Sequence, residues 1–210
     1  ERVLAMGSGP WYRRMALQRA GLAVADRVLD VGIGTGLVAR EALGLIGPGG
    51  RLTGVDPSPG MMGQVDLAGV ELLQGRAEAL PRDDASCDFL SMGYALRHVG
   101  DVPAAFAEFH RVLRPGGRVL VLEISKPASR AGTWLLKAYM RARVPLIARA
   151  VSRRRDTARL WRYYWDTIEA CVPPSGVIDT LEKAGFTGVN RHAESRALSI
   201  LAEYQASKPA

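Results

Sequence analysis

The chain has 210 residues, 48% of them hydrophobic, which is enough for one sizeable core and favours a single domain over residues 1–210. Its two cysteines, Cys87 and Cys171, lack the spacing of a disulfide framework or a metal site, so we expect free thiols in a cytoplasmic protein. Arg and Lys interrupt the apolar runs before the roughly 20 residues of a membrane span, and we expect no signal peptide.

The net charge of +7 is distributed unevenly along the chain. Residues 126–162 contain 11 basic side chains and 1 acidic one, whereas the rest of the chain carries 17 basic and 20 acidic side chains. This basic segment is a candidate contact for anionic lipid, nucleic acid or an acidic partner. The alternative is a well-solvated helical face.

Short aliphatic runs alternate with helical stretches, which is the pattern of a Rossmann-like α/β fold with right-handed crossovers. We expect a mostly parallel sheet of seven strands that includes an antiparallel C-terminal hairpin strand, with helices on both faces. The expected strands are Arg27–Val31, Arg51–Asp56, Val70–Gln74, Cys87–Met92, Arg118–Ile124, Thr187–His192 and Arg196–Tyr204.

Turn residues predict where several helices begin and end. The Gly-rich segments 47–50 and 114–117 should each end a helix with a glycine in the left-handed conformation. Asp101 is the expected N-cap of a helix that runs to Leu113, and a further helix is expected over Ser175–Ala184.

Residues 126–172 break the alternation and predict a basic, helical insertion after the fifth strand. One helix is expected over Trp134–Val144 and another after Asp156. The second helix carries one apolar stripe, which either packs into the core or lines an apolar pocket. The stripe consists of Leu160, Trp161, Tyr164, Trp165 and Ile168.

The first strand runs into a glycine-rich loop, Asp30-Val31-Gly32-Ile33-Gly34-Thr35-Gly36. Glycines there let a ligand approach the backbone amides at the start of the following helix. A dinucleotide fingerprint would have its third glycine one position later, and the Asp30 carboxylate would repel a diphosphate. The same carboxylate would attract an ammonium group, so the loop favours S-adenosyl-L-methionine, with S-adenosyl-L-homocysteine as product.

The second and third strands end in residues that would complete the cofactor site. Asp56 stands where an acid accepts hydrogen bonds from ribose hydroxyls in Rossmann-type sites, although it could also simply cap its loop. Backbone groups of the segment 75–81 could bracket an adenine edge. The further candidates for cofactor contacts are Pro57, Ser58, Met61, Arg76, Ala77, Glu78 and Gly93.

These residues resemble class I methyltransferases, and later segments are similar to the UbiE-type C-methyltransferases of menaquinone and ubiquinone biosynthesis. The similar segments are Leu96-Arg97-His98-Val99, Arg114-Pro115-Gly116-Gly117, Ser125-Lys126-Pro127 and Tyr163-Tyr164-Trp165-Asp166. Two positions depart from that family, because His98 replaces an Asn and Arg76 replaces an Asp. The resemblance implies a quinol- or phenol-type ring as the methyl acceptor and Tyr139, Trp161, Tyr164 and Trp165 as its contacts.

The residues after the fourth strand, Tyr94, Arg97 and His98, should lie where a parallel sheet forms its ligand crevice. We expect His98 to remove a proton from a ring hydroxyl and Arg97 to stabilise the resulting phenolate, with no metal ion. The alternative is that both side chains merely order the loop. His110 and His192 are expected to be structural.

Other functions remain open at this level. A natural-product phenol or a phospholipid amine would suit the same cofactor site, and a non-catalytic module that binds the cofactor is possible. An RNA methyltransferase is disfavoured because no Asn/Asp-Pro-Pro-aromatic motif follows the fourth strand and neither cysteine is placed to attack a pyrimidine. A small hydrophobic or aromatic molecule is therefore the expected partner, with peripheral contact to an anionic membrane through residues 126–162.

Overall fold

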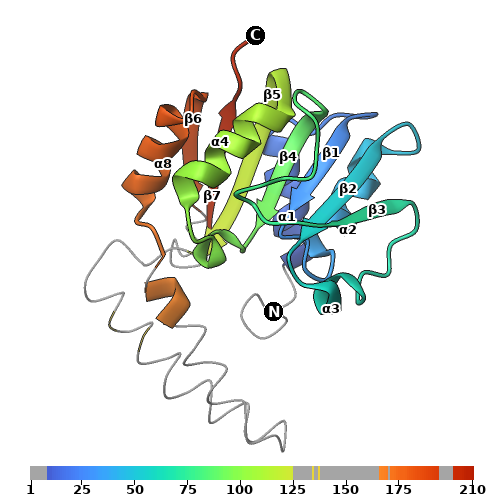
Figure 1. Ribbon diagram of the computed structural model, residues 1–210, viewed down its shortest axis with the longest axis horizontal. Coiled ribbons are helices and arrows are strands. Elements are labelled where there is room, and N and C mark those ends of the chain that lie inside the picture. The colour runs from blue at the N-terminus through green and yellow to red at the C-terminus, as the bar shows by residue number, and fades with distance from the viewer. Residues whose placement is uncertain (1–8, 125–133, 135–136, 138–165, 170, 194–200) are drawn as a thin grey trace, which may run out of the picture.

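A computed structural model describes residues 9–124, 134, 137, 166–169, 171–193 and 201–210. Seven strands form one sheet in the order β3-β2-β1-β4-β5-β7-β6, in which only β7 runs antiparallel to its neighbours (Figure 1). The expected fold class, a mostly parallel sheet with an antiparallel C-terminal strand, is confirmed. The strands are β1 (Arg27–Val31), β2 (Arg51–Asp56), β3 (Val70–Gln74), β4 (Cys87–Gly93), β5 (Leu113–Ile124), β6 (Thr187–Ala193) and β7 (Leu201–Ser207).

Helices cover both faces of the sheet, as Figure 1 shows. One face packs against α4 (Val102–Val112) and α8 (Pro174–Lys183), and the other packs against α1 (Gly9–Arg19) and α2 (Leu37–Ile46). Shorter segments, α3 (Pro59–Met62) and the 3-10 turn η1 (Leu96–His98), follow the carboxyl ends of β2 and β4. The sequence analysis placed no element in the region of α1.

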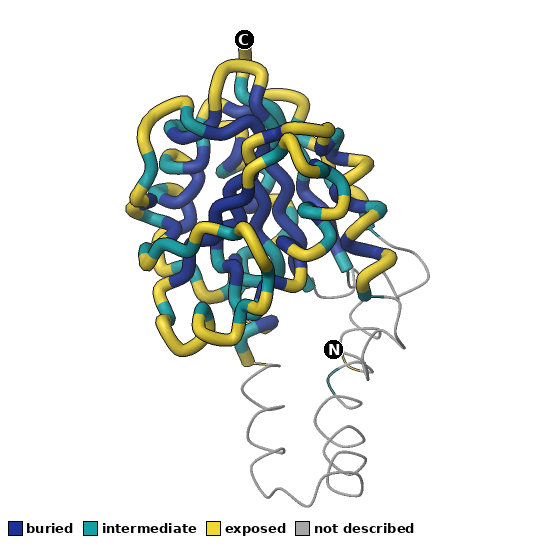
Figure 2. The backbone as a smooth tube through the Cα atoms, turned by 90° about the vertical axis from the view of Figure 1, so that its right-hand side faces the viewer, coloured by how far each residue is buried: buried dark blue, intermediate teal, exposed yellow. Residues whose placement is uncertain are grey.

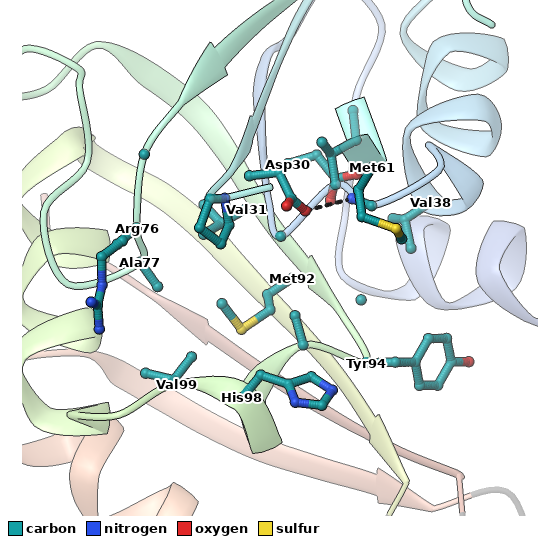
Figure 3. A pocket seen from close by; sticks show the side chains of 18 of the residues that line it. Asp30, Val31, Val38, Met61, Arg76, Ala77, Met92, Tyr94, His98 and Val99 are labelled. Atoms are coloured by element: carbon teal, nitrogen blue, oxygen red, sulfur yellow. Dashed lines mark hydrogen bonds between the residues drawn. The ribbon is translucent and has the colours of Figure 1, made fainter. Parts of the chain in front are cut away.

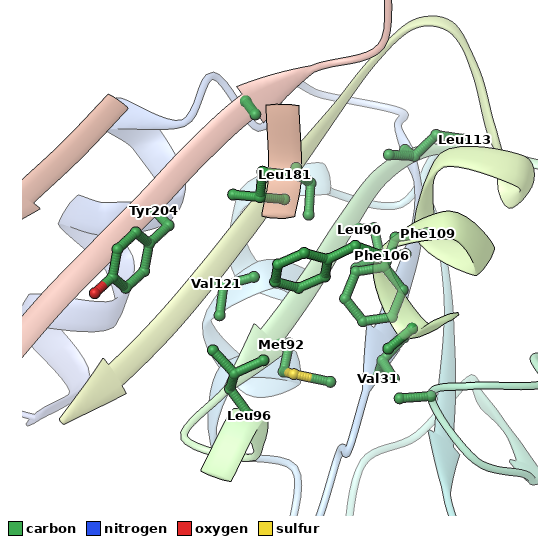
Figure 4. Close-up of a cluster of buried hydrophobic side chains, with 14 of the residues drawn as sticks. Val31, Leu90, Met92, Leu96, Phe106, Phe109, Leu113, Val121, Leu181 and Tyr204 are labelled. Carbon is green, nitrogen blue, oxygen red and sulfur yellow. The ribbon is translucent and has the colours of Figure 1, made fainter. Parts of the chain in front are cut away.

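Each face therefore has its own hydrophobic core, and the central strands contribute to both. Figure 2 shows the buried backbone, in dark blue, running through the middle of the molecule, with exposed loops around it. On the α4 side, the rings of Phe106 and Phe109 are fully buried 5.7 Å apart, beside Leu90 and Leu181 (Figure 4). At about 25 cal/mol per Å² of apolar surface, aromatic pairs of this kind supply much of the free energy that holds helices on the sheet.

Strand ends agree with the sequence analysis best in the amino-terminal half. The predicted bounds of β1, β2 and β3 are confirmed, and Asp101 caps α4 by accepting a 3.0 Å hydrogen bond from the Ala104 amide. Gly47 ends α2 at a φ of 66°, a value that favours glycine, although its ψ of −170° is not that of a left-handed helix.

Two predictions about β5 and β7 were wrong. The helix α4 ends at Leu113 in extended conformation, and residues 114–117 belong to β5 as a bulge, with Gly116 at a φ of 74°. The cause is long-range pairing, because the Gly116 amide donates to the Lys208 carbonyl and the Lys208 amide donates to the Gly117 carbonyl. For the same reason β7 continues to Ser207, beyond the predicted end at Tyr204. The predicted start of that strand lies outside the described residues.

The predicted insertion is described only in part. Residues 166–169 are helical, and Ile168, a member of the predicted apolar stripe, is 2% exposed. Among its other described side chains, Lys137 forms an ion pair with Glu169 at 2.8 Å and Trp134 is exposed. The helices predicted over 134–144 and after Asp156 otherwise fall outside the described residues, as do Tyr139, Trp161, Tyr164 and Trp165.

Candidate functional site

The order of the strands creates a topological switch point between β1 and β4. The chain adds β2 and β3 on one side of β1 and then returns to add β4 and β5 on the other side. At such a point the loops that leave neighbouring strands diverge, and a crevice opens beyond their carboxyl ends. A cavity of about 640 Å³ lies there, which we call the main cavity.

The main cavity is lined by loops that follow β1, β2, β3 and β4 (Figure 3). Most of the residues predicted to form the site line it: Asp30, Gly32, Gly34, Asp56, Pro57, Met61, Arg76, Ala77, Glu78, Gly93, Tyr94, Arg97 and His98. Among the predicted site residues that the structure describes, two are not part of the lining. Gly36 is the N-cap of α2 at a φ of 79°, and Ser58 caps α3 by accepting a hydrogen bond from the Met61 amide.

The loop that follows β1 is held in a conformation that requires glycine. Gly32 has a φ of 68°, and a Cβ at this position would lie 2.6 Å from the Cβ of Ala95, which belongs to the loop after β4. The amides of Gly32 and Ile33 donate to the Val55 carbonyl at 2.7 and 3.1 Å. The close packing of these two loops therefore leaves no room for a side chain at position 32.

Asp30 provides a buried carboxylate at the carboxyl end of β1. Its side chain is 1% exposed; Oδ1 accepts a 2.7 Å hydrogen bond from Ser91, the residue paired with it on β4. Within the described part of the chain, Oδ2 accepts no hydrogen bond with normal geometry. Burial raises the pKa of Asp30 to about 7, only partly offset by Ser91 and the nearby Ala39 amide.

An unpaired buried carboxylate oxygen is costly unless a donor satisfies it. Because Asp30 lines the main cavity, a cationic N–H donor bound there would satisfy it and favour its charged form. The ammonium group of S-adenosylmethionine has this chemistry, so the residues present fit the cofactor that the sequence predicts.

Asp56, at the end of β2, is 7% exposed and closes the glycine loop. Its Oδ2 accepts a hydrogen bond from the Gly34 amide and its Oδ1 accepts one from the Ser58 amide, each at 2.9 Å. Asp56 therefore does cap its loop, which was the alternative to ribose binding. A carboxylate has about four lone-pair sites, so these two bonds still leave capacity for ribose hydroxyls.

The loop after β3 brings Arg76 and Glu78 into the lining of the main cavity, and Arg76 is labelled in Figure 3. Arg76 forms an exposed ion pair with Glu78 at 3.4 Å, while the Gly100 amide donates to Oε1 of Glu78 at 2.9 Å. Burial opposes ionisation of Glu78, but these hydrogen bonds outweigh it and lower its pKa. The side chain of Arg76 is thus directed to its neighbour Glu78, and Ala77 between them also lines the cavity.

Tyr94 follows β4 in an unusual backbone conformation, with a φ of 60°. A non-glycine residue at positive φ costs of order 1–3 kcal/mol and is kept only where surrounding contacts impose it. Here the Tyr94 amide donates to the Leu122 carbonyl at 2.7 Å, and the buried Arg13 guanidinium lies 5.9 Å from the ring. Figure 3 shows the Tyr94 ring extending away from His98. No local signal in the sequence indicated that Arg13 is buried.

Arg97 lines the main cavity, but its charge is already paired. Its Nη1 donates to Oε1 of Glu123 at 2.6 Å and its backbone amide donates to Oε2 at 3.2 Å; the two side chains are 5% and 3% exposed. The Ile124 amide also donates to Oε1. Burial raises the pKa of Glu123, and the charge of Arg97 opposes this shift. The sequence analysis did not identify Glu123.

His98 follows Arg97 in η1 and lines the main cavity, and it is exposed. Partial burial, followed by the positive charge of Arg97, lowers its pKa below the usual 6.5. This shift favours the neutral imidazole, which is the form that can accept a proton. Neither of the other histidines lines a described cavity, and His110 packs edge-on against Phe186 at 5.2 Å.

Two further features concern partners. None of the described helices has the length and apolarity needed to cross a lipid bilayer. Within the same described residues, no group of three or more His, Cys, Asp or Glu side chains is arranged to hold a metal ion.

Comparison with known proteins identifies relatives over nearly the whole chain. The family model described as the ubiE/COQ5 methyltransferase family matches residues 1–208. A demethylmenaquinone methyltransferase from Mycobacterium sp. (strain KMS) is 34% identical over 187 residues, covering 89% of this chain and 79% of the relative. A ubiquinone/menaquinone biosynthesis C-methyltransferase UbiE from Pseudomonas savastanoi pv. phaseolicola is 31% identical, covering 99% and 82%.

Solved structures support the fold. A SAM-dependent methyltransferase from Aquifex aeolicus superposes with a TM-score of 0.67 at 19% identity, covering 93% of this chain and 88% of that one. Phosphoethanolamine N-methyltransferase 2 from Haemonchus contortus, solved with S-adenosyl-L-methionine, gives a TM-score of 0.69 at 17% identity, covering 95% and 53%. At these identities the two structures are evidence for the fold alone.

Proposed function

Since the chain belongs to the ubiE/COQ5 methyltransferase family, and is an S-adenosylmethionine-dependent methyltransferase, we propose that it methylates a ring carbon of a hydroxylated quinol-type acceptor. The observation that carries the proposal is the agreement over residues 1–208 with a family whose relatives are named for quinone biosynthesis. The main cavity supports it, because a buried carboxylate and a neutral histidine line the same space.

The cofactor would be held by the amino-terminal half of the sheet. Asp30 would accept hydrogen bonds from the ammonium group, Asp56 from the ribose hydroxyls, and the backbone of the loop around Ala77 would face the adenine. Once bound, S-adenosylmethionine supplies a methyl group that is already electrophilic, because it is attached to a sulfonium. The protein's remaining work is to orient the acceptor and to manage one proton.

His98 is the residue we assign to that proton. A quinol carbon is a weak nucleophile until a ring hydroxyl loses its proton, since the phenolate then shifts electron density onto the ring. The lowered pKa of His98 keeps its imidazole neutral and available as a base at pH 7. Methyl transfer leaves the ring carbon with both its hydrogen and the new methyl group. This C–H bond would then break with loss of its proton to solvent, while protonated His98 would return its proton to the ring oxygen, so that the aromatic quinol forms again and one proton is released overall.

Arg97 receives a different role from the one expected from sequence. Phenolate stabilisation requires a positive charge directed at the acceptor, whereas the Arg97 charge is largely neutralised by Glu123 at 2.6 Å. Because Glu123 also accepts the Arg97 amide, the pair fixes the turn that presents His98. We therefore assign Arg97 as a positioning residue.

The proposal includes contact with an anionic membrane, from which a hydrophobic quinol would be taken. Its support is the charge of residues 126–162, 11 basic side chains against 1 acidic one. The expected result is flotation of the protein with vesicles that contain an anionic phospholipid and none with neutral vesicles. Equal behaviour with both kinds of vesicle would count against membrane contact.

The experiment for the acceptor is an incubation with methyl-labelled S-adenosylmethionine and a panel of quinols, simple phenols and phosphatidylethanolamine, read by product mass and fragmentation. We expect one label on a ring carbon of a quinol. Label only on oxygen or on the ethanolamine nitrogen would reject the proposal in favour of those acceptors. Matched incubations with His98→Ala identify background transfer.

A further inference from the structure

Ser91, on β4, is a polar residue in the core to which the sequence analysis gave no role. It is 1% exposed, and its neighbours along the strand, Leu90 and Met92, are apolar and equally buried. A buried hydroxyl costs free energy unless it is hydrogen-bonded, so the partner of Ser91 decides what it can do. That partner is Asp30, whose Oδ1 accepts a hydrogen bond from the Ser91 hydroxyl at 2.7 Å.

The register of the sheet brings Ser91 and Asp30 together. Asp30 is paired with Gly54 of β2 on one side and with Ser91 of β4 on the other. Val28 and Phe89, two positions earlier on β1 and β4, pack in the core on the α1 and α2 side of the sheet. Alternation along a strand puts the side chains of Asp30 and Ser91 on that side as well. Since Gly54 has no side chain, Ser91 is the one of these two neighbours that can hydrogen-bond to the carboxylate.

This hydrogen bond divides the two carboxylate oxygens of Asp30 between the protein and the main cavity. Oδ1 is held by Ser91, whereas Oδ2 accepts no hydrogen bond with normal geometry within the described part of the chain. Asp30 lines the main cavity and Ser91 lies behind it, outside the lining. A carboxylate that is already fixed can offer one oxygen to a cationic donor without a further cost of ordering its side chain.

The same hydrogen bond favours the charged form of Asp30. Burial raises the pKa of Asp30, the Ser91 hydroxyl lowers it most, the Ala39 amide of α2 also lowers it, and the charge of Asp56 at the end of β2 raises it. Further ionisable side chains line the same cavity: Arg76, Glu78, Tyr94, Arg97 and His98. Of these, His98 has its usual pKa closest to neutrality. Its contribution is common to all variants at position 91 and cancels when they are compared.

Resting on the proposed function, in which Asp30 receives the ammonium group of the cofactor, we propose that Ser91 is a positioning residue of the cofactor site. Its hydroxyl holds Oδ1 of Asp30, so that the charged Oδ2 faces the ammonium group. Ser91 acts through Asp30 on the binding of S-adenosylmethionine and not on methyl transfer. Its loss should therefore raise KM for the cofactor and change kcat at saturating cofactor little.

The test is Ser91→Ala, with calorimetric binding of S-adenosylmethionine measured from pH 5.5 to 9. A hydrogen bond to a charged group is worth about one to two pKa units, so we expect the midpoint of the affinity profile to rise by about one pH unit. Affinity should be about tenfold below that of the wild type at pH 6. It should be within about threefold at pH 9, where Asp30 is charged in both proteins.

The matched control is Ser86→Ala, which removes another buried hydroxyl. Ser86 precedes β4, and its hydroxyl has no hydrogen-bond partner among the described residues and lies outside the lining of the main cavity. Ser86→Ala should keep the wild-type midpoint, and so should Ser91→Thr, which retains a hydroxyl. If Ser91→Ala does not fold, Ser91→Cys, whose thiol is a weaker donor, should raise the midpoint by a smaller amount.

Two kinds of failure can be told apart. If Ser91→Ala lowers the free energy of unfolding but keeps the wild-type midpoint, Ser91 is merely structural and the inference is overturned. An equal rise of the midpoint in Ser86→Ala would overturn it too, because the effect would not depend on the bond to Asp30. If the wild-type profile is itself flat, the proposed contact between Asp30 and the ammonium group fails, and the role of Ser91 fails with it.

Discussion

The two halves of the main cavity are built in different ways. On the cofactor half, after β1 and β2, the site rests on loops that are held by glycines at positive φ and by amides that bond to Val55 and Asp56. On the acceptor half, after β4, it is mostly side chains, held by the buried pair of Arg97 and Glu123 and by the contact of Tyr94 with Arg13. The comparison teaches that one half carries a glycine spacing that is recognisable in the sequence, whereas the other depends on a buried charge pair that no spacing marks.

We expect the largest effect from removing the proposed base in the acceptor half. His98→Ala should lower kcat by about 10²- to 10⁴-fold, the usual contribution of a positioned base, while S-adenosylmethionine affinity stays unchanged. In the wild type at saturating cofactor, kcat should fall with decreasing pH below 6.5, because the lowered pKa of His98 sets the acidic limb. Steady-state kinetics with a quinol acceptor from pH 5 to 9 measure the kcat of the variant and the pH dependence of the wild-type kcat. A variant with wild-type kcat and the same acidic limb would exclude His98 as the base.

The next effect concerns the pair that holds the acceptor loop. Glu123→Gln leaves Arg97 buried without its counter-ion, and should lower the free energy of unfolding by about 3–5 kcal/mol. Asp84→Asn is the matched control, because Asp84 pairs with Arg111 at the same 2.6 Å but is 79% exposed. Asp84→Asn should lower the free energy of unfolding by at most about 1 kcal/mol. Urea unfolding that gives equal losses for both variants would contradict the role of burial.

In the cofactor half, the corresponding test adds a single methyl group to the glycine loop. Gly32→Ala combines a φ of 68° with a 2.6 Å approach to the Cβ of Ala95, so it should lower the free energy of unfolding by about 2–4 kcal/mol and weaken cofactor binding. Gly69→Ala has a φ of 77° with nothing within 4 Å of the added Cβ. In this control, the free energy of unfolding should fall by only about 1–2 kcal/mol, and cofactor binding should stay normal. A Gly32→Ala protein as stable as Gly69→Ala would show that the loops do not meet.

The smallest expected effect is the pH dependence of cofactor affinity, which tests the cofactor half alone. Burial raises the pKa of Asp30 to about 7, and an ammonium group binds only to the charged carboxylate. Affinity for S-adenosylmethionine should therefore be constant well above pH 7 and fall by about tenfold per pH unit well below it. Equilibrium binding between pH 5.5 and 8.5 measures this. A flat profile in the wild type would mean that Asp30 does not meet the cation.

The two halves also differ in how much of their structure could be predicted from the sequence. The bounds of β1 to β3 and the loop that starts at Asp30 follow from alternating aliphatic runs and glycine spacing, which are local signals. Glu123 lies 26 residues from Arg97 and falls at the end of the apolar run 119–122 of β5, where no pattern identifies its partner. The burial of Arg13 could not be predicted either, because the Tyr94 ring that it lies against is distant in the sequence.

The bulge in β5 shows the same limit. The segment 114–117 has the composition of a helix-ending turn, yet pairing with Lys208, more than ninety positions away, makes it part of the sheet. A cavity of about 340 Å³ beyond the carboxyl end of β5 was also beyond prediction, since its lining brings together residues as distant in sequence as Leu96, Val172 and Tyr204. Side chains that meet only through the tertiary fold leave no spacing in the sequence.

The measurement closest to the central claim is a calorimetric titration of wild type and Asp30→Asn with S-adenosylmethionine and, separately, with NADH at pH 8. The account predicts that the wild type binds S-adenosylmethionine and not NADH, and that Asp30→Asn binds it about 10- to 100-fold more weakly, the value of a charge-assisted hydrogen bond. Equal affinity of the two proteins for S-adenosylmethionine, or tight binding of NADH, would contradict it.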